Sequence, residues 1–210
     1  MKIGHFAFWY RWFEYAAFWR ALERQRYRYL GRLAHARSIL VVGEGDGRAL
    51  ARLLSVAPEA NIDVVELSGE MIALARRRVA HSNRVRFLQA DALTEPWPST
   101  HYDGVITLFF LDCFNEADLY TVIQKVSGAI APGALWLVSD FAIPESGWQH
   151  WHARLWIWAM YRFFSIATGL RTRKLPPIRA YLEDAGLQRL EWKDERAGLI
   201  TSEVWAKTFD

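Results

Sequence analysis

Residues 38–47 read Ser-Ile-Leu-Val-Val-Gly-Glu-Gly-Asp-Gly, and they decide the fold. The apolar, β-branched run predicts a short buried strand. Three alternating glycines follow, which permit a tight turn and let a ligand approach the backbone without a Cβ in the way. Residues 48–57 then have helical spacing and stop before Pro58. A strand, a glycine loop and a helix therefore follow one another.

The alternation continues outward from this stretch. We expect strands at 62–67, 85–89, 102–110 and 134–141, helices at 70–80 and 118–129, and one or two aromatic helices within 8–33. A helix at 178–185 precedes strands at 187–193 and 200–207, joined by a turn at Ala197-Gly198. Such a hairpin makes one terminal strand antiparallel. The predicted fold class is α/β, a Rossmann-like, doubly wound, mostly parallel seven-stranded sheet with an antiparallel terminal hairpin and helices on both faces.

Charge and aromatic residues gather in two segments, 1–38 and 141–180. Together these carry a net charge of +11 and 19 of the 31 aromatic residues, whereas the remainder of the chain sums to −8. Neither segment is apolar for long enough to predict a membrane span, and the N-terminus does not resemble a signal peptide. A single cysteine permits no intrachain disulfide, so we expect a cytoplasmic protein.

Three strand ends carry residues suited to binding a ligand. In an open parallel sheet, ligands bind beyond the carboxyl ends of the strands. The glycine loop follows the first strand, Glu66 ends the second and can accept ribose hydroxyl protons, and Asp91 follows the third, where it can take an adenine amino proton. Arg48 stands where the nicotinamide fingerprint needs its last glycine, which disfavours a dehydrogenase.

In this order, the segments resemble the motifs of class I S-adenosylmethionine-dependent methyltransferases of the small-molecule type. The resemblance spans residues 35–207. It rests on residues 39–47, 64–71, 88–92, 102–107 and 135–140, and on the terminal hairpin. It implies S-adenosylmethionine as cofactor and S-adenosylhomocysteine as product. The positions that it implies for cofactor binding are Gly43, Glu44, Gly45, Gly47, Glu66, Leu67, Met71, Asp91, Ala92, Thr107, Leu108 and Phe109.

We therefore expect one methyltransferase domain over residues 1–210. Its parts are an N-terminal helical cap (1–37), a cofactor-binding core (38–141), an aromatic lid insert (142–177) and a C-terminal helix and hairpin (178–210). The reaction is an in-line displacement onto O, N or C of a small, apolar, lipid- or quinone-like acceptor.

Two residues are candidates for catalysis. Asp112, just beyond the fourth strand, is placed to take a proton from the acceptor, although it could instead cap the next helix. His150 is the second candidate, because the insert overhangs the acceptor in this family. His150 and His152 have no accompanying cysteines or carboxylates, so no metal site is predicted.

The two basic aromatic segments leave three interpretations open. They form a lid over an apolar acceptor pocket, they dock peripherally at the inner face of a membrane, or they pack as ordinary core or as a homodimer seam. Other functions stay open too: a non-catalytic binding module on this fold, or a nucleic-acid methyltransferase. The second is suggested by a pI near 9.1, but the chain lacks the Asn-Pro-Pro-Tyr or Asp-Pro-Pro-Tyr signature, so no nucleic-acid partner is expected.

Overall fold

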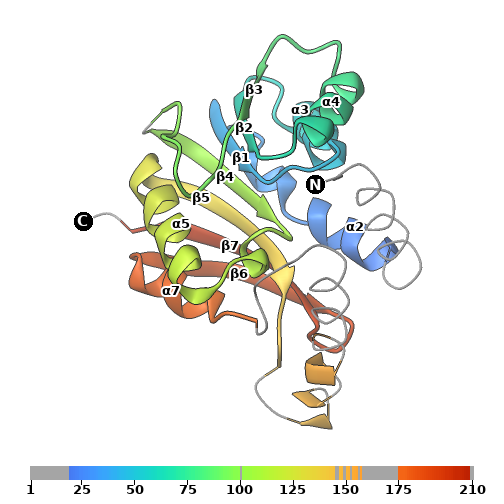
Figure 1. The fold of residues 1–210 in the computed structure, drawn as a ribbon, viewed down its shortest axis with the longest axis vertical. Coiled ribbons are helices and arrows are strands. Elements are labelled where there is room, and N and C mark those ends of the chain that lie inside the picture. Colours follow the sequence, from blue (N-terminus) through green and yellow to red (C-terminus); the bar gives the residue numbers. More distant parts are fainter. Residues whose placement is uncertain are drawn as a thin grey trace.

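The computed structural model describes residues 19–99, 101–144, 147–148, 150–151, 153–155, 157 and 175–208. Seven strands form one sheet in the order β3-β2-β1-β4-β5-β7-β6 (Figure 1). The strands are β1 (Ser38–Val42), β2 (Asn61–Glu66), β3 (Val85–Gln89), β4 (Tyr102–Leu108), β5 (Ile130–Phe141), β6 (Leu187–Glu195) and β7 (Ile200–Lys207). β1 to β5 pair in parallel, while β7 is antiparallel to both β5 and β6. The predicted fold class is confirmed.

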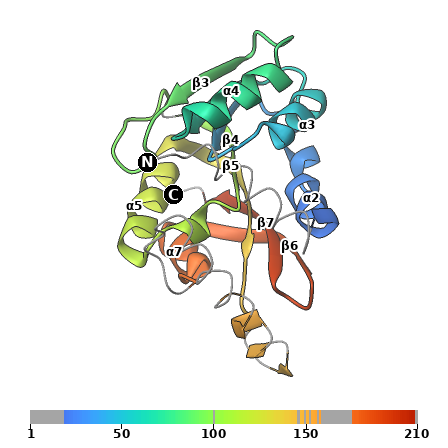
Figure 2. The ribbon, with the colours of Figure 1, turned by 45° about the vertical axis from the view of Figure 1, so that its right-hand side comes forward.

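Helices cover both faces of the sheet, as Figures 1 and 2 show. One face carries α2 (Trp19–Tyr27), the 3-10 turn η1 (Leu30–Leu33), α3 (Arg48–Val56) and α4 (Gly69–Arg78). The other face carries α5 (Glu116–Ala129) and α7 (Ile178–Asp184), and a second 3-10 turn, η2 (Leu111–Cys113), precedes α5. Residues 8–18, the first part of the segment in which one or two helices are expected, and the insert residues 158–174 lie outside the described residues.

β1 shows why a continuous apolar run suits a sheet covered on both faces. Side chains alternate along a strand, so Ile39 and Val41 pack with Leu53 of α3, while Leu40 and Val42 pack with Val122 of α5. All four β1 side chains are at most 2% exposed. Burying one such aliphatic side chain contributes roughly 1.5–3 kcal/mol, which holds the strand before the glycine loop in a fixed place.

Several predicted strand boundaries differ from the observed ones by one to four residues, and the backbone explains two of these differences. β5 begins at Ile130 rather than at residue 134, because Ile130 pairs with Tyr102 before the register shifts, and Pro132-Gly133 lies within this irregularity. β4 ends at Leu108 rather than at residue 110. The next residue, Phe109, has a φ of 55°, which turns the chain out of the strand.

A third apolar cluster lies beyond the carboxyl end of β4. It joins Ala21 and Leu22 of α2, Phe109, Ala153 and Ile157 of the insert, and Leu199 and Ile200 of the hairpin. Ala153 and Ile157 are only 1% and 4% exposed. The helix α2 and the described insert residues therefore pack over the end of β4. The proposed division of the chain into cap, core, insert and hairpin remains a prediction.

Candidate functional site

The glycine loop needs glycine for two different reasons. Gly43, Gly45 and Gly47 have φ values of 71°, 70° and 86°, in the left-handed region that favours glycine. A Cβ on Gly43 would also lie 2.3 Å from the Phe110 ring, and one on Gly47 would lie 2.6 Å from the Cα of Ala75. At Gly45 a Cβ would meet nothing within 4 Å. Gly45 is therefore the point of the loop with open space beside its backbone.

The carboxylate of Glu66 joins the glycine loop to the end of β2. Its Oε2 accepts a hydrogen bond from the Gly45 N–H (3.1 Å), and its Oε1 accepts one from the Ser68 N–H (2.9 Å). Ser68 in turn caps α4 by accepting from the Met71 N–H (3.3 Å). Leu67 is 67% exposed, and Met71 is half-buried. The predicted residues of β1 and β2 thus lie together at one edge of the sheet.

The end of β3 adjoins the same edge, because Gln89 pairs with Glu66 and the Ala90 N–H donates to the Glu66 carbonyl (3.2 Å). Asp91 uses its Oδ1 to accept from the Leu93 N–H (2.9 Å), so it also stabilises its own turn. Ala92 is buried, and its carbonyl accepts from Lys125 Nζ (2.8 Å). Neighbouring strands lie about 4.8 Å apart, so β1 to β3 span the length of an adenosyl group.

At the end of β4, the three predicted contact residues differ in access. The Thr107 side chain is fully buried, and its Oγ1 accepts from Trp136 Nε1 (2.9 Å), which leaves only its backbone for a ligand. Leu108 is half-buried. Phe109 carries the positive φ, its N–H donates to the Ser139 carbonyl (2.6 Å), and the guanidinium of Arg26 lies 5.2 Å from its ring.

Glu44 points back toward α3. Its Oε1 accepts from the Leu50 N–H (2.8 Å), within the first turn of that helix, whose N-cap Gly47 has no side chain to offer. Burial raises the pKa of Glu44 to about 7. Its Oε2 is buried and receives no hydrogen bond in the described part of the chain. A cationic or N–H ligand group beside the loop would satisfy this oxygen.

Asp112 lies beside a second buried acid, Asp140, which sequence reasoning missed. Asp112 does not cap α5, because Asn115 does so by accepting from the Asp118 N–H (3.0 Å). The two side chains belong to residues only 5% and 1% exposed, and burial raises the pKa of both carboxyls. The signal was available, since Asp140 stands at the carboxyl end of β5, the parallel neighbour of β4.

His150, the other catalytic candidate, is half-buried at the start of the insert. Its Nδ1 lies 2.8 Å from the Pro144 carbonyl, to which it can donate, so the second ring nitrogen is left as the acceptor. The Trp151 ring stands edge-on at 5.7 Å. His152 lies outside the described residues. Within the described ranges, no group of three or more acids, histidines or cysteines is placed to hold a metal ion.

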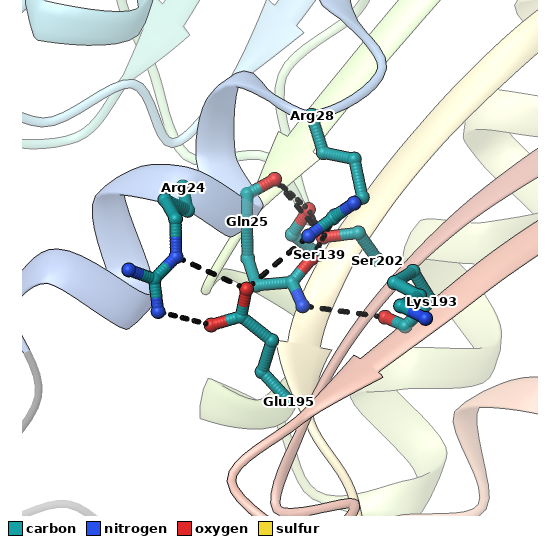
Figure 3. Close-up of polar contacts among 7 residues, drawn as sticks. All are labelled: Arg24, Gln25, Arg28, Ser139, Lys193, Glu195 and Ser202. Atoms are coloured by element: carbon teal, nitrogen blue, oxygen red, sulfur yellow. Dashed lines mark hydrogen bonds and ion pairs between the residues drawn. The ribbon is translucent and has the colours of Figure 1, made fainter.

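The cap helix α2 is fastened to the β6–β7 hairpin by a polar network (Figure 3). Both Ser139 Oγ (3.3 Å) and Ser202 Oγ (2.9 Å) donate to the main-chain carbonyl of Gln25, a residue that is 1% exposed. Arg24 forms a bidentate ion pair with Glu195 (3.0 and 3.1 Å), and Arg28 forms a second ion pair with the same carboxylate (3.2 Å). These bonds hold the cap over the sheet edge that carries the site.

Comparison with known proteins gives a consistent result. A family model described as a methyltransferase domain matches residues 39–133. The 2-phytyl-1,4-naphtoquinone methyltransferase of Thermosynechococcus vestitus is 24% identical over 182 residues, which cover 80% of this chain and 79% of that protein. The demethylmenaquinone methyltransferase of Thermus thermophilus is 34% identical over 110 residues, covering 52% of this chain and 49% of that protein.

Among solved structures, the N-methyltransferase NodS of Bradyrhizobium japonicum in complex with S-adenosyl-L-homocysteine matches with a TM-score of 0.63. The match has 17% identity and covers 89% of this chain and 88% of that one, so it bears on the fold. The predicted motifs occupy the sheet edge that this fold provides for a ligand. Taken with the methyltransferase-domain model and the methyltransferase relatives, they support a methyltransferase enzyme that is similar to the class I S-adenosylmethionine-dependent methyltransferases.

Proposed function

We propose that this enzyme transfers the methyl group of S-adenosylmethionine to O, N or C of a small apolar acceptor of the lipid or quinone type. The observation that carries the proposal is the hydrogen bond from the Gly45 N–H to Glu66 (3.1 Å), which joins the loop and the acid beside open space. Two relatives named for quinone-type substrates support this acceptor class. The chain covers about half of one of them, so the acceptor is part of the proposal.

The residues present fit the cofactor. Glu66 keeps acceptor capacity for the ribose, because each carboxylate oxygen can accept more than one hydrogen bond. The exposed Leu67 and the half-buried Met71 would flank the adenine, and Asp91 with Ala92 would contact its edge. The buried Oε2 of Glu44, which receives no hydrogen bond from the residues that the structure describes, suits the cationic methionine end. When bound, the cofactor supplies a methyl group already activated on a sulfonium.

For a hydroxyl acceptor, Asp112 would take the proton. Its carboxylate would accept the hydroxyl proton while the acceptor oxygen takes the methyl group, which the bound cofactor would supply in activated form. Phe109 and the insert residues Ala153 and Ile157 would exclude water from this place, since they form one apolar cluster over the end of β4. Positioning and water exclusion are the main contributions of the protein, because the leaving group needs no further activation.

Titration with S-adenosylhomocysteine tests the assignment of the cofactor. We expect heat on binding and a thermal shift corresponding to about 2.7 kcal/mol at one hundred times the dissociation constant. Glu66→Ala should abolish both, whereas Glu59→Ala, an exposed acid before β2, should change neither. Absence of binding by the folded wild-type protein would refute the proposal and favour a non-catalytic module. That no nucleic acid is bound also stays a prediction.

The insert carries an exposed apolar surface that could dock on a membrane, from which a lipid- or quinone-type acceptor would enter. Trp148, Trp151 and Leu155 are 70%, 71% and 64% exposed and recur at helical spacing, opposite the buried Ala153 and Ile157. Residues 141–180 carry six arginines or lysines against one acid. No helix within the described residues is long and apolar enough to span a bilayer. We propose that this surface rests on an anionic membrane, at its cytoplasmic face, where lipid-like acceptors enter.

A further inference from the structure

Asp112 and Asp140 form a buried carboxyl pair at the carboxyl ends of β4 and β5. Asp140 is the last residue but one of β5, which pairs with β4 on one side and with β7 on the other, where the partner of Asp140 is Thr201. Both oxygens of Asp140 are buried, and neither receives a well-formed hydrogen bond from a described N–H or O–H group. The backbone N–H groups of Leu111 and Asp112 lie near enough to lower its pKa only in part.

The state in which both carboxyl groups of this pair are ionised is unfavourable. A buried acceptor without a donor costs roughly 1–3 kcal/mol, and two like charges at close range raise that cost. The Asp112 carboxyl is within hydrogen-bonding range of Asp140, yet a hydrogen bond between two carboxyl groups requires a proton on one of them. A single shared proton removes one charge and supplies the missing donor at the same time.

We propose that Asp140 holds this proton and donates it as a hydrogen bond to Asp112, which makes Asp140 the positioning residue for the proton acceptor. The inference rests on the proposed function, because it assigns Asp112 to the acceptor. During transfer the acceptor proton passes to Asp112, the pair then carries two protons, and one returns to solvent after product leaves. Asp140 itself touches no substrate.

Other titratable groups also face this end of the sheet. From η2, the Cys113 thiol donates to Asp112 Oδ1 (3.6 Å). Glu66 at the end of β2 acts on Cys113 through its charge, and Arg26 of α2 lies over Phe109. Burial and the charge of Asp112 both raise the pKa of Asp140, whereas the hydrogen bond with Asp140 partly offsets the raised pKa of Asp112. Loss of that hydrogen bond should therefore raise the pKa of Asp112 further.

Infrared spectroscopy of the ligand-free protein tests the pair without any substrate. All variants carry Glu44→Gln as well, because Glu44, with a pKa of about 7, would add a protonated-carboxyl band of its own. In this background we expect the carbonyl band of a protonated carboxyl group at pH 7, lost in Asp140→Asn and retained in Asp112→Asn. The control Asp103→Asn, whose carboxylate accepts from the Arg37 and Ser38 N–H groups at the opposite end of β4, should keep the band. A spectrum of Asp140→Asn identical to that of the Glu44→Gln protein alone would overturn the shared proton.

The dependence of kcat/KM on pH tests the positioning role, with menadiol, a reduced naphthoquinone, as acceptor probe. Asn at position 140 can still donate to Asp112, so the acidic limb should stay within about 0.3 pH units. Leu cannot donate, so Asp140→Leu should move that limb upward by about one unit or more. If Asp140 serves only in packing, the acidic limb should move in neither variant, or by the same amount in Asp140→Asn and Asp140→Leu. Either result contradicts the inference.

Asp112→Asn separates the inference from the proposed function. We expect a loss of kcat of about 10²- to 10⁴-fold with unchanged binding of S-adenosylhomocysteine. Full activity of this variant would refute Asp112 as proton acceptor even if the infrared band follows Asp140. Failure of the wild type to methylate menadiol would refute the quinone-type acceptor, while the infrared result still decides the pair. Circular dichroism checks that each variant folds.

Discussion

At the scale of single residues, the turn between β6 and β7 stores backbone strain. Arg196, Ala197 and Gly198 have φ values of 52°, 57° and 85°, and the Gly198 N–H donates to the Glu195 carbonyl (3.1 Å). Positive φ at both central residues suits a hairpin because it matches the twist of the strands, but it strains residues that carry a Cβ. At the tip of the hairpin, the backbone therefore adopts the conformation that matches the strand twist, at the cost of a strained φ in Arg196 and Ala197.

Ala197→Gly should relieve this strain. We expect the free energy of unfolding to rise by about 0.5–1 kcal/mol, measured by urea denaturation, because the relief exceeds the entropy that glycine adds to the unfolded chain. Ala34→Gly is the matched control. Ala34 has a φ of −58°, so the same substitution there should lower stability by a similar amount. A loss of stability in both variants would contradict the claim that the positive φ of Ala197 is strained.

Glu44 should make stability depend on pH. Its pKa is raised in the folded protein to about 7. The folded state therefore binds the proton more tightly than the unfolded chain, so this contribution is fully present below the unfolded pKa of about 4.3 and is lost as the pH rises through 7. Glu44→Gln should flatten the decline in stability between pH 5 and 7.5 by about 1–3 kcal/mol, measured by denaturation at each pH. An unchanged slope would show that another group causes the decline.

At the scale of elements, the docking of α2 depends on the serine pair below it. Ser202→Ala removes one of two hydroxyl donors to the buried Gln25 carbonyl, and we expect a loss of about 1 kcal/mol. Hydrogen exchange should accelerate in residues 19–27 more than in β1. Ser55→Ala, which removes an exposed hydroxyl on α3, should alter neither stability nor exchange. Uniform acceleration throughout the sheet would indicate a global effect instead.

The elements of the core could be predicted from sequence because each depends on local pattern. Apolar runs and glycines placed all seven strands and the loop 43–47, and the order of strand ends placed Gly45, Glu66 and Asp91 along one edge. The pairing of Ile130 with Tyr102, the turn at Phe109 and the carboxyl pair depend on partners distant in the chain. The place of Asp140 near the carboxyl end of β5 could be predicted from the sequence, but the side chain of Asp112 reaches it only through the turn that follows β4.

At the scale of the whole molecule, the charge separation between the core and the two aromatic segments bears on membrane binding. The triple variant of Trp148, Trp151 and Leu155 to Ala should lose sedimentation with vesicles of anionic phospholipid at low salt, because it removes the exposed apolar face. Trp192→Ala is the matched control, since Trp192 is also 54% exposed but packs against Arg189 on β6. Binding by wild type should weaken as salt is added.

Two outcomes would refute membrane docking. If wild type does not sediment with the vesicles at low salt, the surface has another role. If the same triple variant instead converts a dimer to a monomer in analytical ultracentrifugation, the face is a seam between copies of the chain. If the surface serves only as a lid, the triple variant should change neither the sedimentation with vesicles nor the oligomeric state.

The position of β7 has a consequence for synthesis on the ribosome. β7 follows β6 in the chain but lies between β5 and β6 in the sheet, and among the described strands β6 pairs with β7 alone. While the chain emerges, β5 keeps an open edge and β6 has nowhere to pair until β7 has left the exit tunnel. Unpaired edges of this kind recruit other strands. Nascent chains stalled while β7 is still inside the exit tunnel should therefore be held by chaperones or aggregate, and only chains with β7 outside the tunnel should acquire protection from proteases.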